Sequence, residues 1–296
     1  MNKILLTGKN GQVGFELQRA LAPLGEVLAV DHAECDLSRP EAIRQLVQQL
    51  RPGIIVNPAA YTAVDKAETD QDLAYAVNAT APGVFGEEAR KLGALVIHYS
   101  TDYVFDGTKA GAYLESDVPN PQSIYGKSKL AGEQALLASG ACALVFRTSW
   151  VFGAHGNNFA KTMLRLAGER DSLNVVADQH GAPTSAALLA DVTAQIIGQY
   201  RRADVAAFPY GLYHLVAGGL TTWHDYARTV VGAARSAGKN LKLAPEHIKA
   251  ITTADYPLPA PRPANSHLAT DKLQNTFGLK LPVWQHGLDH VLQQIL

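Results

Sequence analysis

The stretch Lys3-Ile4-Leu5-Leu6-Thr7-Gly8-Lys9-Asn10-Gly11-Gln12-Val13-Gly14 decides the fold. Residues 3–7 predict a short buried strand, and apolar residues follow at helical spacing over residues 11–24. The glycines Gly8, Gly11 and Gly14 permit a tight turn and a close approach of the backbone to a pyrophosphate, which the free amides of a helix N-terminus also attract. An ordinary strand-to-helix turn is the alternative. The position between a predicted strand and a predicted helix favours a dinucleotide-binding turn, although the spacing is G-x-x-G-x-x-G.

The first half of the chain alternates between strand and helix patterns. This alternation indicates βαβ units and a parallel sheet that is buried on both faces. Right-handed crossovers then favour an α/β fold with a doubly wound parallel sheet of the Rossmann-like type. The predicted strands are Lys3–Thr7, Glu26–Asp31, Ile54–Asn57, Ala94–Ser100 and Ala143–Ser149. The predicted helices are Gly11–Leu24, Pro40–Leu50 with Ser38 as a possible cap, Leu73–Leu92 and Ser123–Ala138.

The pattern becomes less regular after Trp150. We expect a dinucleotide-binding domain at residues 1–150 and a smaller C-terminal substrate lobe at residues 151–296, with residues 180–205 able to pack back onto the first domain. Four prolines within residues 256–263 exclude a regular helix or a central strand there and predict an ordered loop or a linker. Helical patterns occur at 158–167, 186–200, 221–237 and 284–296, and a possible strand at 213–216.

Composition limits the classes of function. The chain has 296 residues, 47% hydrophobic and 18% charged, as in globular proteins. The net charge of −1 argues against a protein held to nucleic acid by phosphate neutralisation. No apolar stretch reaches the roughly 18 residues that span a bilayer, and the run Ile4–Leu6 is too short for a signal-peptide core. Two cysteines, Cys35 and Cys142, cannot form a disulfide framework. We therefore expect a cytoplasmic protein that binds neither nucleic acid nor membranes.

Acidic and small residues follow the second and third predicted strands. Asp31 ends the second strand, where a carboxylate can accept hydrogen bonds from the adenosine ribose and favours NAD over its 2′-phosphate form. A capping aspartate is the alternative, and His32 could tolerate a phosphate. Asp36 and Leu37 could flank the adenine by hydrogen bonding and packing. The small residues in the segment 57–61 would let the backbone pass close to a cofactor, or form a plain turn.

Tyr125 and Lys129 lie four residues apart and share one face of a predicted helix. A nearby ammonium stabilises a phenolate, so we expect Lys129 to lower the pKa of Tyr125 toward neutrality. Lys129 could also hold the nicotinamide ribose. Thr101 or Ser100, at the end of the preceding strand, could hydrogen-bond a substrate carbonyl, because ligands bind at the carboxyl ends of strands in open α/β sheets. A solvated helix face and a strand-end cap are the alternatives.

Together, the glycine turn, the strand-end Ser100-Thr101 and the Tyr-x-x-x-Lys pair resemble the short-chain dehydrogenase/reductase superfamily in its extended form. Longer motifs resemble the dTDP-4-dehydrorhamnose reductase family over nearly the whole chain, and the run from Ser100 to Phe105 is quite specific. The motifs that carry this resemblance are Asn57–Glu68, Tyr99–Gly107, Tyr125–Glu133, Arg147–Val151, Asn157–Met163, Asp178–Thr184, Tyr213–Gly219 and Arg262–Ser266.

The resemblance implies an NADPH- or NADH-dependent oxidoreductase. It would reduce the C4 ketone of dTDP-4-dehydro-L-rhamnose, the last step of dTDP-rhamnose biosynthesis for bacterial surface polysaccharide. By the same resemblance, Tyr125 donates a proton to the forming alkoxide, Lys129 holds the cofactor and tunes Tyr125, and Thr101 bonds near the carbonyl. The positions that match cofactor contacts are Gly11, Gln12, Val13, Asp31, Asp36, Leu37, Ala60, Tyr61, Thr62 and Tyr99, beside Gly8 and Gly14 of the turn.

The resemblance also places residues around the nucleotide sugar. Asp102 and Trp150 would line the sugar pocket, and the C-terminal lobe would hold most of the substrate. Asn158 and Arg262 would bind the phosphates, for which the planar guanidinium is suited because it donates two parallel hydrogen bonds. A surface arginine in the proline-rich loop is the alternative for Arg262.

Some members of this family are described as magnesium-dependent dimers. In this chain Glu16 and Asp191 are acidic, but the residues from Ala186 to Ala190 are apolar, and no cluster of oxygen ligands supports a Mg²⁺ site. We expect no bound metal, and we expect His286 and His290 of the last helix to be surface residues. A homodimer is possible.

Two other functions are compatible with these motifs. A nucleotide-sugar epimerase or dehydratase has the same fold, but a dehydratase generally needs a further acid/base pair, and here Tyr103 follows Asp102 where a glutamate would be needed. A non-catalytic regulatory subunit that binds a dinucleotide is the other alternative, which the presence of Thr101, Tyr125 and Lys129 disfavours.

Overall fold

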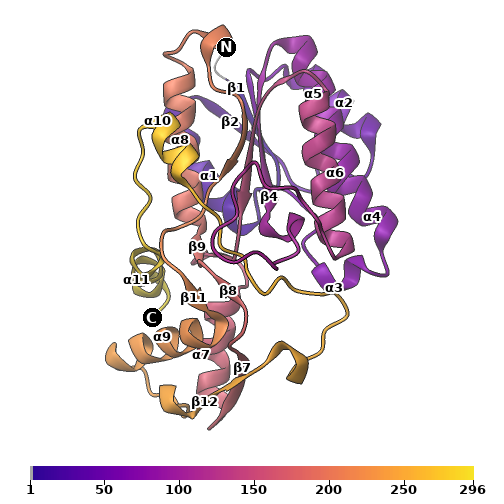
Figure 1. Ribbon diagram of the computed structural model, residues 1–296. Coiled ribbons are helices and arrows are strands. Elements are labelled where there is room, and N and C mark those ends of the chain that lie inside the picture. Colours follow the sequence, from indigo (N-terminus) through magenta and orange to yellow (C-terminus); the bar gives the residue numbers. More distant parts are fainter. Residues whose placement is uncertain (1–2) are drawn as a thin grey trace.

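A computed structural model describes residues 3–296 and is built on a six-stranded sheet (Figure 1). The strand order is β10-β5-β4-β3-β1-β2, and every neighbouring pair is parallel. Because β1 lies between β2 and β3, the chain reverses its direction of winding at β1, which makes the gap between β1 and β3 the topological switch point. The strands are β1 (Lys3–Leu6), β2 (Glu26–Ala29), β3 (Ile54–Asn57), β4 (Leu95–Thr101), β5 (Cys142–Thr148) and β10 (Gly211–His214).

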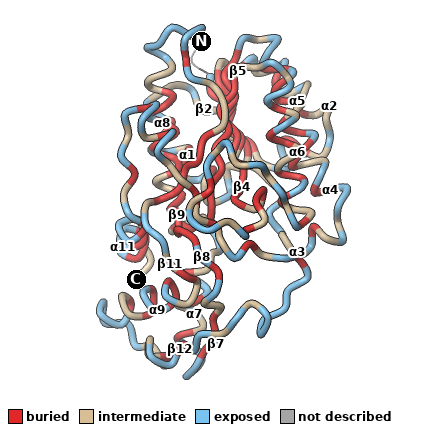
Figure 2. The backbone as a smooth tube through the Cα atoms, viewed as in Figure 1, coloured by how far each residue is buried: buried red, intermediate tan, exposed pale blue. Residues whose placement is uncertain are grey.

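The central strands are apolar along their whole length because both faces of the sheet are covered. Every residue of β3 and β4 is buried. Alternate side chains enter two separate cores, with Leu6 and Ile97 on one face and Leu5 and Val96 on the other. Figure 2 shows these buried strands, in red, running through the upper half of the molecule.

Helices cover both faces, which confirms the expected doubly wound fold. On one face α1 (Gln12–Leu21), α8 (Ala186–Tyr200) and α10 (Asp271–Phe277) contribute to the core. On the other face lie α2 (Pro40–Leu50), α5 (Ala81–Leu92) and α6 (Ile124–Ala138). One strand and two helices of this unit, β10, α8 and α10, come from residues beyond 150. We keep the division at residue 150 as a proposal, with these segments returning to the first unit.

A smaller lobe lies beyond the carboxyl ends of the sheet strands (Figure 1). It has its own core, to which Met163, Tyr226 and Leu288 contribute. Three strand pairs brace it: β6 (Val151–Phe152) with β9 (Thr184–Ser185), β7 (Leu173–Val176) with β12 (Ile248–Ile251), and β8 (His180–Gly181) with β11 (Thr221–Thr222). Its helices are α7 (Phe159–Glu169), α9 (Trp223–Ser236) and α11 (Trp284–Ile295). Within residues 3–296, no helix has the length and apolar character needed to cross a bilayer.

The segment expected as one helix over residues 73–92 is three consecutive pieces. It contains α4 (Gln71–Tyr75), a π-helical turn at Ala76–Thr80, and α5. The reason is Pro82, which has no N–H for the carbonyl of Asn78 and whose ring would clash with it in an α-helix. The Asn78 carbonyl instead approaches α6 so closely that a Cβ at Gly132 would lie 2.0 Å from its oxygen.

Short elements complete the chain. Helix α3 (Val64–Ala67) was not predicted, and Ser38 does not cap α2: the cap residue is Arg39, and the Ser38 hydroxyl donates to Asp36 instead. The proline-rich segment 256–263 is irregular, as predicted. The single 3₁₀ turns are Ala22–Leu24, η3 (Asp102–Val104), Val205–Ala207, Pro245–His247 and Thr253–Asp255.

A buried ion pair fixes α6 to the sheet. Arg147 of β5 donates to both carboxylate oxygens of Glu133, from Nε at 2.9 Å and from Nη2 at 2.7 Å, and both side chains are 3% exposed. The guanidinium also lies 5.0 Å from the ring centre of Phe105, in the loop after β4. Because a buried charge without its partner is strongly unfavourable, this pair holds helix, strand and loop in one arrangement.

We therefore expect Arg147→Met to lower the free energy of unfolding by about 3–5 kcal/mol, because the Glu133 carboxylate is left buried and unpaired. Arg165→Met, which removes the solvent-exposed pair with Glu169, is the control and should change stability by no more than about 0.5 kcal/mol. Urea denaturation measures both. Equal effects of the two substitutions would contradict this role of the buried pair.

Candidate active site

The glycine turn joins β1 to α1 at the switch point. Gly8 has φ +61°, and a Cβ at this position would lie 3.0 Å from the Cβ of Ala59, which follows β3. A Cβ at Gly14 would lie 2.0 Å from the Gly8 carbonyl oxygen, so only glycine lets α1 start this close to β1. Gly11 caps α1 without any side-chain hydrogen bond to the helix amides, which leaves the first turn, with Gln12 and Val13, able to receive an anion.

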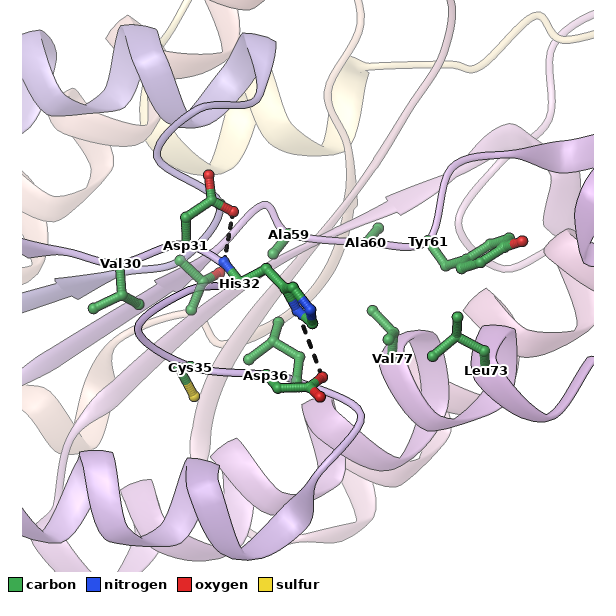
Figure 3. Close-up of a pocket in the computed structure, with 13 residues that line it drawn as sticks. Val30, Asp31, His32, Cys35, Asp36, Ala59, Ala60, Tyr61, Leu73 and Val77 are labelled. Atoms are coloured by element: carbon green, nitrogen blue, oxygen red, sulfur yellow. Dashed lines mark hydrogen bonds and ion pairs between the residues drawn. The ribbon is translucent and has the colours of Figure 1, made fainter. Parts of the chain in front are cut away.

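A cavity of about 250 Å³ opens beside this turn. It is walled by the ends of β1, β2 and β3 and by the helical segment that contains Leu73 and Val77. Figure 3 shows His32 and Asp36 on one side of it and Val77 and Leu73 facing them. It therefore combines apolar walls with carboxylates at one end, as suits a base and a ribose. The lining residues are Thr7, Gly8, Val30, Asp31, His32, Cys35, Asp36, Leu37, Ala59, Ala60, Tyr61, Leu73 and Val77.

Hydrogen bonds hold the polar end of this cavity in place. An Asp31 carboxylate oxygen accepts from the His32 amide at 2.8 Å, and the Asp31 amide donates to Glu34. Glu34 in turn pairs with Lys9 of the glycine turn. Nδ1 of His32 lies 3.6 Å from an Asp36 carboxylate oxygen. The sequence analysis identified Asp31 and Asp36 here but not the Lys9–Glu34 pair, which joins residues 25 positions apart.

Among the expected cofactor residues, Thr62 and Tyr99 do not line this cavity. Thr62 is exposed and does not line the cavity. The Tyr99 side chain is buried in the core, where its ring packs on Phe146 and its hydroxyl lies 2.6 Å from that of Thr193. Its ring therefore does not face the cavity, and its backbone carbonyl instead holds Lys129.

The strand-end threonine and the tyrosine–lysine helix meet where β4 ends. Ser123 caps α6 by accepting from the Gly126 amide at 3.1 Å. A Cβ at Gly126 would lie 2.2 Å from the Tyr103 carbonyl oxygen, so glycine allows the helix to start against η3. Thr101 accepts from the Tyr103 amide at 3.2 Å and donates to Asp102 at 3.1 Å.

The phenol of Tyr125 is protonated at neutral pH. Burial raises its pKa to about 12, while the Thr101 hydroxyl lowers it and the Asp102 carboxylate raises it. The expected lowering by Lys129 is wrong for this structure, because the Lys129 ammonium bonds to other groups and burial dominates. A phenol in this state suits a proton donor.

Lys129 is 2% exposed and donates to the Tyr99 carbonyl at 2.6 Å. Its Nζ also lies 3.2 Å from Nε2 of His98. Burial lowers its pKa to about 8, against the opposing effect of Glu133. It therefore carries its charge at neutral pH and loses it in mildly alkaline solution.

Asp102 begins η3 directly after β4, and Trp150 lies between β5 and the first strand of the smaller lobe, β6. Asp102 is buried, and burial raises its pKa to about 6. Trp150 has φ +50°, an unusual conformation for a bulky residue that marks local strain. Its ring stacks at 3.6 Å on Trp223, whose Nε1 donates to Gln179. The sequence pattern gave no signal for Trp223, because it is 73 positions away at the start of a helix.

Both expected phosphate ligands already have partners within the chain. Asn158 caps α7 and donates to Gln12 at 3.1 Å, which links the smaller lobe to the glycine turn. Arg262 donates to Asp65 of α3 at 2.7 Å and to the Ala260 carbonyl. A nucleotide sugar bound by these two side chains would replace those contacts.

Two acidic residues, Glu16 and Asp191, are the candidates for a Mg²⁺ site. Glu16 and Asp191 both pair with Arg19, at 3.3 and 2.9 Å, so one guanidinium already engages both carboxylates. Across residues 3–296, no group of three or more histidine, cysteine, aspartate or glutamate side chains is placed to hold a metal. These residues do not fit a Mg²⁺ ion.

A parallel sheet with a glycine turn at its switch point, and a tyrosine–lysine helix beside a strand-end threonine, defines an oxidoreductase of the short-chain dehydrogenase/reductase type. The chain belongs to the RmlD substrate binding domain family, whose model matches residues 1–296. The predicted family resemblance is thereby confirmed. A dTDP-4-dehydrorhamnose reductase of Shigella flexneri is 53% identical, with 99% of this chain and 97% of that protein covered. The Burkholderia thailandensis enzyme of that name is 47% identical, with 99% of both chains covered.

Solved structures agree with this assignment. The dTDP-4-dehydrorhamnose reductase of Clostridium acetobutylicum superposes with a TM-score of 0.89 at 37% identity, over 98% of both chains. The Bacillus anthracis enzyme, solved in complex with NADP, superposes with a TM-score of 0.88 at 34% identity, over 99% of both chains. A UDP-glucose 4-epimerase of Thermus thermophilus shares only the fold, with 20% identity and a TM-score of 0.77 over 99% of this chain and 98% of that one.

Ala60→Leu should weaken binding of the reduced nicotinamide cofactor about tenfold or more, or ~1.4 kcal/mol, because the larger side chain fills space in the cavity. Ala63→Leu is the matched control, since Ala63 belongs to the same loop but is exposed and outside the cavity. Titration calorimetry with NADPH measures both. Unchanged affinity in Ala60→Leu would show that the cofactor lies elsewhere.

Proposed function

We infer that this chain is an NAD(P)H-dependent dTDP-4-dehydrorhamnose reductase, which reduces the C4 ketone of dTDP-4-dehydro-L-rhamnose in the last step of dTDP-L-rhamnose biosynthesis. The observation that carries this function is the placement of Tyr125, Lys129 and Thr101 together where β4 ends. The chain that holds them is 52–53% identical in sequence to several reductases of that name.

The residues of the crevice fit a nicotinamide dinucleotide. The glycine turn and the uncapped start of α1 suit its diphosphate, and the cavity beside Asp31, Asp36, Leu37, Ala60 and Tyr61 suits its adenosine half. When bound, the reduced nicotinamide supplies a hydride. The protein supplies position and electrostatics for that step.

The proton for the new hydroxyl comes from Tyr125 in this proposal. Its phenol is protonated at neutral pH, and Thr101, which lowers its pKa, is placed to share a hydrogen bond with the substrate oxygen. Lys129, on the same helix, holds the nicotinamide ribose of the cofactor in this proposal. Asp102, Trp150, Asn158 and Arg262 are the proposed contacts of the nucleotide sugar, mostly from the smaller lobe.

Two further expectations belong to the proposal rather than to the structure. The enzyme works in the cytoplasm, where reduced nicotinamide cofactors and activated sugars are made. A homodimer is the proposed assembly, and sedimentation of the purified chain tests it.

Tyr125→Phe should lower kcat by roughly 100-fold to 10,000-fold, the usual contribution of a general acid, while NADPH still binds. Tyr75→Phe is the control, because Tyr75 is an exposed tyrosine of α4 with no place in the site. Turnover is followed as loss of reduced-nicotinamide absorbance with dTDP-4-dehydro-L-rhamnose. Undiminished turnover in Tyr125→Phe would exclude Tyr125 as the acid. Conversion of sugar without net NAD(P)H consumption would indicate an epimerase or dehydratase.

The carboxylate of Asp31 should favour NADH, because it accepts from a ribose hydroxyl and repels a 2′-phosphate. Asp31→Ala should therefore raise the ratio of kcat/KM for NADPH to that for NADH by about tenfold, or ~1.4 kcal/mol. Asp171→Ala, an exposed aspartate before β7, should leave the ratio unchanged. An unaltered ratio in Asp31→Ala would mean that the carboxylate does not face the ribose.

A further inference from the structure

Four buried polar side chains form a continuous chain from the glycine turn to the active-site lysine. The Thr7 hydroxyl donates to Oδ1 of Asn57 at 2.6 Å, and Nδ2 of Asn57 lies 3.1 Å from Nδ1 of His98. Nε2 of His98 lies 3.2 Å from Nζ of Lys129. All four residues are only 1–2% exposed. Of these four residues, only Lys129 has a role in the proposed mechanism.

Strand register explains why these residues line up. Asn57 and His98 are directly paired in the parallel ladder between β3 and β4. Thr7 follows Leu6, which pairs with Val56, so it stands beside Asn57 in the same row. Paired residues of neighbouring strands point to the same face of a sheet. All three therefore face the side that α6 covers with Lys129.

Donor and acceptor requirements then restrict the protonation of His98. A lysine ammonium has three donors and no acceptor. Lys129 gives one proton to the Tyr99 carbonyl, so a second can go to His98 only if Nε2 is unprotonated. The imidazole must then carry its proton on Nδ1 and donate it to the Asn57 side-chain oxygen. This state needs the Asn57 amide turned over relative to the structure, where Oδ1 faces Thr7 and Nδ2 faces His98. The two ends of an amide side chain are assigned by the hydrogen bonds around them, so the charge of Lys129 selects between the two orientations.

The orientation in the structure, with Nδ2 of Asn57 toward His98, has a different consequence. This nitrogen would donate to Nδ1, Nε2 would carry the proton, and the only acceptor opposite it would be an uncharged Lys129 amine. The two amide orientations thus correspond to the two charge states of Lys129. Because an unpaired buried donor is unfavourable, the network and the lysine charge change together.

Charges around the pair favour a neutral histidine. Burial and the neighbouring Lys129 hold the pKa of His98 well below its usual range. Glu133 favours the charged lysine, although it is itself paired with Arg147. Titratable and charged groups on α6 and on elements packed against it include Tyr125 and Glu133 on α6, His98 and Tyr99 on β4, Asp102 and Tyr103 on η3, and Arg147 on β5.

We propose that His98 is a positioning residue for the reduction: as the Nδ1–H tautomer, held by Asn57 and Thr7, it accepts a hydrogen bond from Lys129 and keeps the ammonium charged. The third N–H of the Lys129 ammonium can then donate to a ligand bound at the active site. The part of this proposal that concerns catalysis rests on the proposed reductase activity. Removal of the acceptor leaves a buried ammonium less stabilised, so the lysine loses its charge at a lower pH.

The first test is the tautomer itself. Long-range ¹H–¹⁵N spectra of the full-length, ligand-free chain identify which ring nitrogen carries the proton, and the signal that disappears in His98→Gln belongs to His98. The expected result is a proton on Nδ1 at neutral pH. A proton on Nε2 would overturn the proposal. This measurement needs no substrate, so it decides the inference even if the proposed function fails.

The second test is the pH profile of kcat. His98→Leu removes the acceptor, and the alkaline limb should move about one pH unit or more toward neutrality, a tenfold change in the ionisation constant of the controlling group. His98→Gln supplies a side-chain carbonyl that can accept from Lys129, and it should return the alkaline limb most of the way to its wild-type pH. His214→Leu is the control, because His214 is also a fully buried histidine of the sheet, on β10, without contact to Lys129.

An alkaline limb that stays in place in His98→Leu, or that moves equally in His214→Leu, would overturn the proposal. If His98→Leu does not fold, His98→Gln and the tautomer spectrum still decide it. Wild-type protein that consumes no reduced cofactor with the sugar would instead refute the proposed function.

Discussion

The close passage of β1 against the loop after β3 is the constraint on which the site depends. Gly8 lies so near Ala59 that an added Cβ would be in tight contact, and Gly14 lets α1 start directly over the Gly8 carbonyl. Two larger residues at these places would separate the strands and displace the helix N-terminus. The loops after β1 and β3 also line the cavity, so a change in their spacing would alter the glycine turn and the cavity together.

Buried charge is the second constraint, and the structure meets it twice on α6. The Glu133 carboxylate is paired with Arg147, while the Lys129 ammonium is held by a carbonyl and an imidazole. A buried pair is neutral as a unit, whereas Lys129 remains a net charge whose pKa falls to about 8. Helix α6 thus carries Glu133, whose buried ion pair stabilises the fold, and one turn earlier Lys129, whose pKa of about 8 lies close to neutral pH.

Much of this arrangement could be predicted from local pattern. The alternation of apolar strands and helices predicts the sheet, and the four-residue spacing of Tyr125 and Lys129 places both on one helical face. Contacts between distant segments could not be predicted this way. The stacking of Trp150 on Trp223, the pairing of Arg262 with Asp65, and the two-residue strands of the smaller lobe depend on tertiary packing and leave no periodic signal. The pKa of Tyr125 was mispredicted because burial, which spacing does not report, outweighs the effect of a neighbouring charge.

The contacts between the two halves of the molecule are of a kind that a charged ligand can replace. Asn158 bonds to Gln12 across the lobes, and Arg262 pairs with Asp65 where the carboxylate is 39% exposed. Ion pairs that water reaches contribute little, about 0–1 kcal/mol. A diphosphate carries more charge than one carboxylate and accepts two parallel hydrogen bonds from a guanidinium. Exchange of Asp65 for a diphosphate is therefore favourable for Arg262, and it would tie the proline-rich loop to the ligand instead of to α3.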